Sequence, residues 1–120
     1  MAELCRRSKQ RVPAAEEIER FLDAPDVHTF VAEEQGELAG FAYCHELLRI
    51  DGDTMIFLYE LEVYEPFRRR GIGRALVEEA KRLAAGRRLF VLADEGNEAA
   101  VRTYASAGGK PQSQVIFRFG

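Results

Sequence analysis

Several kinds of chemistry-bearing residue are scarce in this 120-residue sequence, which has no tryptophan, two cysteines and two histidines. Cys5 and Cys44 show neither CxxC nor metal-ligand spacing, and two histidines are too few for a histidine-based metal site. No stretch approaches the ~20 uncharged apolar residues that a membrane span needs. Residues 1–12 contain no apolar run of signal-peptide length. We therefore expect a cytoplasmic protein that holds no metal and crosses no membrane.

What is present is the composition of an ordinary globular domain, with 47% hydrophobic and 31% charged residues. A chain of 120 residues has the length of one domain and can bury one core. Because no repeat, low-complexity tract or linker interrupts it, we expect a single domain over residues 1–120.

The net charge is only −3, but acidic and basic residues are unevenly distributed along the chain. Residues 33–65 contain nine acidic residues and one basic residue, Arg49, whereas residues 66–88 contain eight basic and two acidic ones. Such blocks suggest a cationic ligand for the first and an anionic ligand for the second, although two solvated faces would give the same pattern. A nucleic acid is not expected, because the pI is about 5.5 and no aromatic stacking platform accompanies the basic residues.

Hydrophobic periodicity and turn residues predict eight elements in the order α-β-β-β-α-β-α-β. The helices are expected at residues 13–24, with Pro13 in the first turn, at 71–85 and at 97–109, and the strands at 27–34, 39–50, 54–63, 88–94 and 114–119. This order predicts an α+β fold, with a mixed, mostly antiparallel sheet flanked by helices.

Two of these elements have patterns that predict their surroundings. Strand 54–63 is apolar on both faces until Glu60 and Glu62, so we expect a central strand that is covered on both faces. Helix 71–85 carries an apolar stripe that begins at Ile72, and Glu78 and Arg82 have the spacing of an i,i+4 ion pair.

The stretch "EPFRRRGIGRALVEEAKRLA" places three arginines and two glycines at the start of that helix. A helix N-terminus presents unpaired backbone N–H groups and partial positive charge, glycine lets a ligand approach closely, and arginine binds phosphate oxygens. The stretch therefore predicts a phosphate cradle that follows a central strand.

Three kinds of phosphate-binding loop are candidates for this cradle. The Walker A string is absent. A dinucleotide fingerprint fits at Gly71 and Gly73 and has Asp94 about 20 residues further on, but Leu76 replaces its third glycine and the arginines would crowd its tight turn. The third pattern is [Q/R]-x-x-G-x-[G/A], which residues 68–73 satisfy.

A second motif follows in the order that the third pattern requires. The chain has Asn97, Ala100, Tyr104 and Gly108 at the spacing N-x-x-A-x-x-x-Y-x-x-x-G. With both motifs, residues 28–119 resemble the GCN5-related N-acetyltransferase (GNAT) family, and most closely its aminoglycoside 3-N-acetyltransferases and their relatives. The resemblance implies the acyl-CoA N-acyltransferase fold and acetyl-coenzyme A as co-substrate.

The resemblance also implies a cofactor site. The pyrophosphate would lie on the backbone and side chains of Arg68, Arg69, Arg70, Gly71, Ile72, Gly73 and Arg74. The pantetheine arm would run along the strand at Leu61 and Val63, where the sheet splays after a bulge, and the Val63 N–H would polarise the thioester carbonyl. Asn97 would hydrogen-bond the arm, although capping its own helix is the alternative role.

The catalytic residues that the resemblance implies are two glutamates and a tyrosine. Glu60 would take the proton of the attacking amine, with Glu62 as the alternative base, and Tyr104 would protonate the leaving thiolate. The two glutamates share a strand face, and burial there would be costly without a role. The structural alternatives are that the glutamates pair with arginines and that Tyr104 belongs to the core.

The predicted function is N-acetyl transfer to a primary amine of a small polycationic acceptor, such as an aminoglycoside, a polyamine or a peptide. Only about 27 residues precede the first predicted strand, so the acceptor side looks shorter than is usual in the family. This suggests two hypotheses: a homodimer in which a second subunit completes the sheet edge, or a module that binds acetyl-coenzyme A with little turnover.

Overall fold

The computed structural model describes residues 14–120, so the predictions for Cys5 and Pro13 lie outside the described residues. In chain order the elements are α2 (Ala15–Asp23), β1 (Val27–Glu34), β2 (Glu37–Leu48), β3 (Thr54–Val63), the 3-10 helix η1 (Glu65–Phe67), α3 (Ile72–Ala84), β4 (Leu89–Val91) and α4 (Glu98–Ser106). Within this part of the chain, no helix has the length and apolarity to cross a bilayer.

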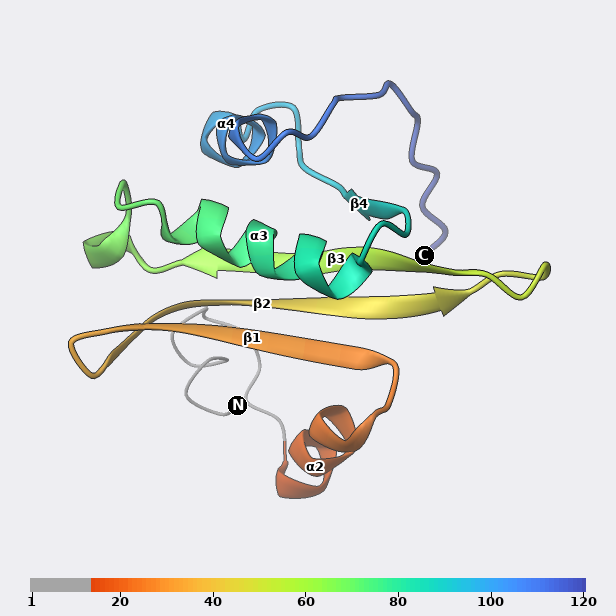
Figure 1. Cartoon of the computed structure of the whole chain (residues 1–120), viewed down its shortest axis with the longest axis horizontal. Helices are drawn as coiled ribbons and strands as arrows, with labels where there is room; N and C mark the ends of the chain where they lie inside the picture. The colour runs from red at the N-terminus through yellow and green to blue at the C-terminus, as the bar shows by residue number, and fades with distance from the viewer. Residues whose placement is uncertain (1–13) are drawn as a thin grey trace.

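The sheet has the strand order β1-β2-β3-β4. β1, β2 and β3 pair antiparallel, and β4 pairs parallel to β3, so the predicted mixed, mostly antiparallel sheet is confirmed. The crossover from β3 to β4 contains α3, which lies along the sheet, while α4 lies beyond α3 and α2 lies near β1 (Figure 1).

The core lies between α3 and one face of the sheet. Leu58 is 1% exposed and Ile56 is fully buried on β3, and they face an apolar stripe on α3 as the periodicity of that helix predicts. The buried members of this core are Ala39, Ala42, Cys44, Ile56, Leu58, Ile72, Leu76, Val77, Ala80, Ala84 and Ala107.

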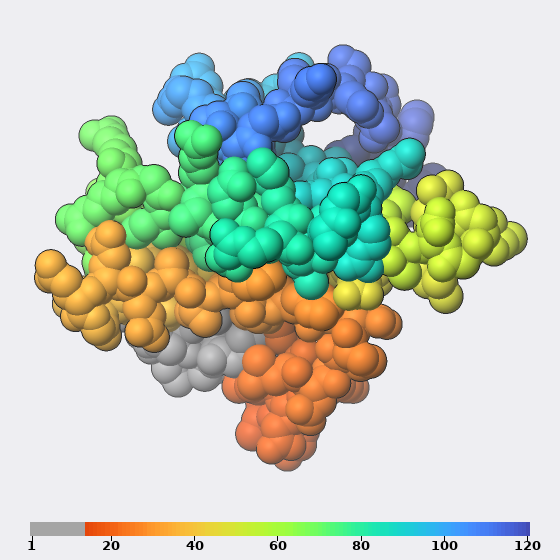
Figure 2. All heavy atoms as spheres, in the orientation of Figure 1, coloured from red at the N-terminus to blue at the C-terminus, as the bar shows by residue number. Residues whose placement is uncertain are grey.

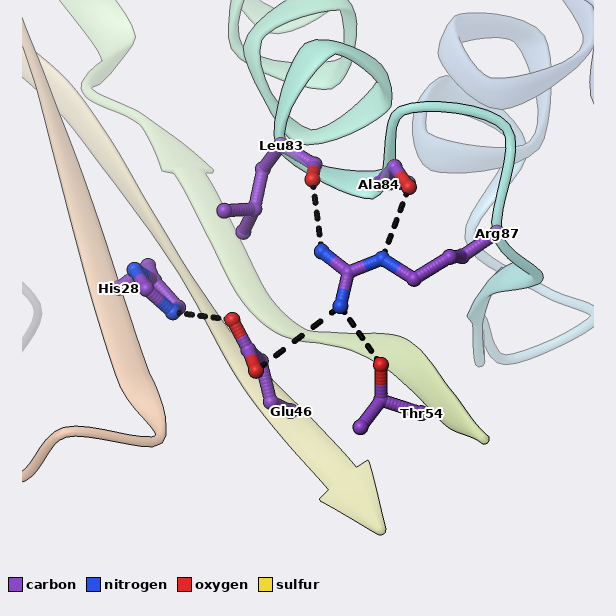
Figure 3. A network of polar contacts seen from close by, with 6 residues as sticks. All are labelled: His28, Glu46, Thr54, Leu83, Ala84 and Arg87. Atoms are coloured by element: carbon purple, nitrogen blue, oxygen red, sulfur yellow. Dashed lines mark hydrogen bonds and ion pairs between the residues drawn. The ribbon is translucent and has the colours of Figure 1, made fainter. Parts of the chain in front are cut away.

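A polar network holds the C-terminal end of α3 against the sheet (Figure 3). The Arg87 guanidinium donates to the carbonyls of Leu83 and Ala84 at 2.9 and 3.0 Å and to the Thr54 hydroxyl at 2.6 Å. It also lies 3.9 Å from the Glu46 carboxylate, which accepts a 2.8 Å contact from His28. Since Arg87 satisfies carbonyls that α3 leaves open, it fixes the helix whose other end carries the predicted cradle.

Three sequence predictions about these elements are wrong. β3 is internal, but its second face is not fully covered, because Tyr59 is 52% exposed there. On α3, Glu78 pairs with Lys81 and Glu79 with Arg82, instead of Glu78 with Arg82. Residues 114–119 form no strand in the described structure, because no neighbouring strand supplies a hydrogen-bonding ladder for their alternating apolar pattern.

Candidate functional site

The candidate site begins at an irregularity in β3. Tyr43 of β2 pairs with Glu60, but its neighbour Cys44 pairs with Leu58, so Tyr59 is an extra residue on β3. Such a bulge bends a strand and interrupts its pairing. On the other side of β3, the ladder to β4 extends only from Ile56 to Leu58. Beyond Leu58, β3 therefore has β2 on one side and an open edge on the other.

Backbone groups of β3 point toward this open edge. The Tyr64 N–H donates to the Ala39 carbonyl at 2.9 Å, so Tyr64 belongs to a hydrogen-bonded pair with β2. Because the bonding direction alternates along an antiparallel strand, the N–H groups of Val63 and Leu61 point away from β2. An extended ligand could therefore pair with β3 at these two residues.

The cradle follows at the end of β3. Gly71 has left-handed φ and ψ of 79° and 9° at the N-cap of α3 and supplies no side-chain cap. The first helical hydrogen bond runs from the Ala75 N–H to the Gly71 carbonyl at 3.0 Å. The N–H groups of Ile72, Gly73 and Arg74 thus have no acceptor within the helix. They point outward at the positive end of a 13-residue helix, which favours an anion.

Two of the four arginines of the cradle contact other protein groups, and two are exposed. Arg68 donates to the Val63 carbonyl at 2.9 Å, and Arg70 forms a 2.5 Å ion pair with Glu34. Arg69 and Arg74 are exposed and have no polar partner within residues 14–120. Arg68 and Arg70 therefore hold the loop in place, while Arg69 and Arg74 are available to an anion.

A cavity of about 270 Å³ opens beside the exposed edge of β3. It is lined by Tyr59, Glu60, Leu61, Leu92, Ala93, Asp94, Asn97, Ala100, Tyr104 and Ile116. Figure 2 shows an opening between the C-terminal segment and the rest of the molecule. The structure thus gathers the predicted residues Glu60, Leu61, Asn97 and Tyr104, while Glu62 and Val63 lie outside the cavity on β3, toward the cradle.

The two α4 residues in the cavity have distinct environments. Tyr104 is half-buried, and burial raises the pKa of its phenol above the usual value of 10.0, so the phenol is protonated at neutral pH. The Asn97 Oδ1 accepts from the Ala100 N–H at 3.1 Å, so Asn97 caps α4 as its sequence position suggested. This bond uses only the carbonyl oxygen of Asn97, and the amide NH₂ group remains a donor.

The carboxylates of β3 share a face, as predicted, but neither is fully buried. Glu60 lies opposite Tyr43 and Glu62 lies opposite Phe41, on the face away from α3. Asp94 adds a third carboxylate to the neighbourhood. The expected cost of burying Glu60 and Glu62 is therefore smaller than the sequence suggested, because both retain contact with water.

Sequence reasoning assigned no role to Tyr59, Leu92 or Ile116, which also line the cavity. Tyr59 could have been noticed as an aromatic residue directly before the acidic pair in an otherwise apolar strand. No sequence signal places Leu92 or Ile116 there, because their positions depend on how the chain runs after β4 and α4.

The dinucleotide interpretation does not fit this geometry. It requires a tight turn from strand to helix, whereas residues 64–71, including η1, separate β3 from α3. Within residues 14–120, no three His, Cys, Asp or Glu side chains gather as metal ligands.

Comparisons with known proteins agree on one family and one fold. A profile described as the acetyltransferase (GNAT) family matches residues 1–108, starting earlier than the motifs alone indicated. No curated protein matches the chain.

Solved structures extend this likeness to almost the whole chain. An aminoglycoside acetyltransferase, meta-AAC0020, from an uncultured soil metagenomic sample, solved with trehalose, has a TM-score of 0.87 and 21% identity over 98% of this chain and 83% of that chain. Aminoglycoside acetyltransferase HMB0005, also from an uncultured soil metagenomic sample, has a TM-score of 0.86 and 27% identity over 99% and 86% of the two chains. Aminoglycoside N-acetyltransferase AAC(6')-Iy in complex with CoA has a TM-score of 0.76 and 22% identity over 88% and 84%.

Proposed function

Because the chain belongs to the acetyltransferase (GNAT) family, we propose that it transfers an acetyl group from acetyl-coenzyme A to a primary amine of a small polycationic acceptor. One observation carries the proposal: the open edge of β3 runs from a cavity lined by two tyrosines and two carboxylates to the N-terminus of α3, which suits an anion. A carrier with an anionic end and an extended arm would fit along this edge, with its far end beside the carboxylates.

The residues of the cradle fit the pyrophosphate of such a carrier. The N–H groups of Ile72, Gly73 and Arg74 would donate to phosphate oxygens, and Arg69 and Arg74 would add charged donors. The backbone of Leu61 and Val63 would hold the arm in register, as a strand partner does. The Asn97 NH₂ group, which the capping bond does not use, would donate to the same arm, since Asn97 also lines the cavity.

Acetyl-coenzyme A would supply the acetyl group as a thioester. Of the two N–H groups that point to the open edge, that of Leu61 belongs to a cavity-lining residue and would stabilise charge on the acyl oxygen, whereas the Val63 N–H, which lies outside the cavity toward the cradle, would pair with the arm. Glu60, half-buried in the cavity wall, would accept the proton that a protonated amine must lose before it can attack, with Glu62 as the alternative base. Tyr104, whose pKa burial raises, would hold the proton needed by the leaving sulfur.

The acceptor class rests on charge. Glu60 and Asp94 line the cavity, and none of the lining residues is cationic. An amine with several positive charges would be attracted to this wall. An aminoglycoside, a polyamine and a peptide amine all meet this description. The alternative function is a module that binds acetyl-coenzyme A with little turnover, which needs the cradle but not Glu60 or Tyr104.

The proposal is tested first by thermal melts with acetyl-coenzyme A and, as control, NAD. At ~100 times its Kd, a bound ligand adds about 2.7 kcal/mol to the free energy of unfolding, which corresponds to several degrees in Tm. We expect a shift with acetyl-coenzyme A and none with NAD. A shift with NAD alone, or with neither ligand, would contradict the proposed co-substrate.

Release of the coenzyme A thiol in the presence of spermidine or an aminoglycoside then distinguishes an acetyltransferase from a module that only binds acetyl-coenzyme A. A melt shift without thiol release from any amine would favour the module. Release that saturates with acceptor concentration would establish the transfer.

A further inference from the structure

The face of the sheet opposite α3 carries a row of aromatic rings around Tyr59. Its ring centroid lies 5.6 Å from Tyr43, 5.5 Å from His45 and 5.4 Å from Phe57. Three neighbours therefore restrict the ring, yet 52% of the residue remains exposed to solvent. A large aromatic ring that is restrained and open is suited to contact a ligand, because little conformational freedom is lost when the ligand binds.

The bulge in β3 determines the position of the Tyr59 ring relative to the carboxylates. Leu58, Leu61 and Val63 all pack toward the α3 core, although strict alternation would place Leu58 on the face opposite the other two. The extra residue Tyr59 shifts the alternation, so Glu60 follows Tyr59 onto the aromatic face. The cavity wall therefore contains an aromatic ring next to a carboxylate.

The charge around Tyr59 favours a cation as its ligand. Glu60 and Asp94 line the same cavity, and no Lys, Arg or His side chain does. The face of an aromatic ring attracts an ammonium group within ~6 Å, the more strongly when water is partly excluded.

We propose that Tyr59 is an acceptor-binding residue whose ring holds an ammonium group of the substrate in a cation–π contact. The contact must involve an ammonium other than the one that reacts, because the attacking amine has to be neutral. Tyr59 would then select acceptors with two or more amino groups. This inference rests on the proposed acetyl transfer for its biological role, but the cation site itself can be tested without turnover.

The test uses choline and its neutral isostere 3,3-dimethylbutan-1-ol as probes, titrated by NMR. Choline has a permanent positive charge, donates no hydrogen bond through its ammonium and cannot be acetylated on nitrogen. We expect choline to bind at least about fivefold more tightly than the neutral probe. Equal binding of both probes, or no binding of choline, would overturn the proposal.

Two variants assign the effect to the ring. Tyr59→Phe keeps the aromatic face and should bind choline within about twofold of the wild type, whereas Tyr59→Leu keeps an apolar side chain and should bind about fivefold more weakly. Phe21→Leu is the matched control, because Phe21 lies 5.2 Å from Tyr43 in the same aromatic row but does not line the cavity. Wild-type affinity in Tyr59→Leu, or equal loss in Phe21→Leu, would contradict a role for Tyr59.

A kinetic measurement connects the site to catalysis. With spermidine as acceptor, Tyr59→Leu should raise the acceptor KM while kcat and the KM for acetyl-coenzyme A stay unchanged, and Tyr59→Phe should restore the acceptor KM. The melt with acetyl-coenzyme A is repeated on each variant. Absence of that shift even in the wild type would count against the proposed function, whereas the choline titration decides the cation site independently.

Discussion

Tyr104 combines the properties that a general acid for a thiolate needs. It lines the cavity, it is half-buried, and its pKa is raised by burial, so it carries a proton throughout the neutral range. Tyr104→Phe removes the hydroxyl and keeps the ring, so we expect kcat to fall by about 100-fold. The Tm shift with acetyl-coenzyme A should stay near that of the wild type, because the cradle lies elsewhere. An unchanged kcat would assign protonation to another group, and a lowered Tm without ligand would make Tyr104 a structural residue.

Individual site residues could be predicted from the sequence to different extents. The Asn97 cap is confirmed, because a helix start has a local signature and the capping bond joins residues three apart. The catalytic roles of Glu60, Glu62 and Tyr104 remain predictions. Sequence alone could not show that Tyr59 and Glu60 share a face, since strict alternation assigns them to opposite faces and the bulge depends on pairing with β2.

The backbone at the start of α3 can be tested separately from the side chains of the cradle. Gly71 has φ of +79°, a conformation that costs an alanine ~1 kcal/mol, and a Cβ there would meet no protein atom within 4 Å. Gly71→Ala should therefore lower stability modestly, while its Cβ would stand in the space where a phosphate approaches the N–H groups. We expect affinity for coenzyme A, measured calorimetrically, to fall by at least about tenfold, the value of one charge-assisted hydrogen bond.

Gly36 offers a matched control for that variant. It lies in the turn between β1 and β2 with the same φ of +79° and also with open space around its Cβ position. Gly36→Ala should lose as much stability as Gly71→Ala and retain wild-type affinity for coenzyme A. If the two variants bind coenzyme A with similar affinity, Gly71 is needed only for the backbone geometry of the helix start.

Complete elements were predictable where their signals were local. The α3 stripe, the capped start of α4 and the β1–β2 hairpin all follow from nearby residues. The prediction for residues 114–119 was wrong because a strand needs a partner, and β4 offers a ladder of only three residue pairs, all to β3. Val115, Phe117 and Phe119 are instead 77%, 78% and 95% exposed. A homodimer remains a prediction, which the mass in solution tests.

One core residue should contribute to the pH dependence of the free energy of unfolding. Cys44 is fully buried in the layer between the sheet and α3, and burial raises its pKa from 9.0 to about 11. Below about pH 9 the thiol is protonated in the folded and the unfolded chain alike, so its contribution to stability is fully present. Above that pH the unfolded chain releases the proton while the folded protein retains it, and the contribution is lost as the pH rises toward about 11.

Comparing the wild type with the Cys44→Ala variant isolates the contribution of the Cys44 thiol. Other groups that titrate at alkaline pH, including Tyr104, are present in both proteins and cancel in the comparison. Each unit of pKa shift is worth ~1.36 kcal/mol, so the free energy of unfolding of the wild type, relative to the variant, should fall by ~2 kcal/mol between about pH 8 and about pH 10.5. Urea unfolding at several pH values measures the difference. Ile56→Val, at another fully buried position of the same core, should keep a constant offset, since no group titrates there. A constant offset for Cys44→Ala as well would mean that water reaches the thiol, and that the layer beneath α3 opens more readily than its burial indicates.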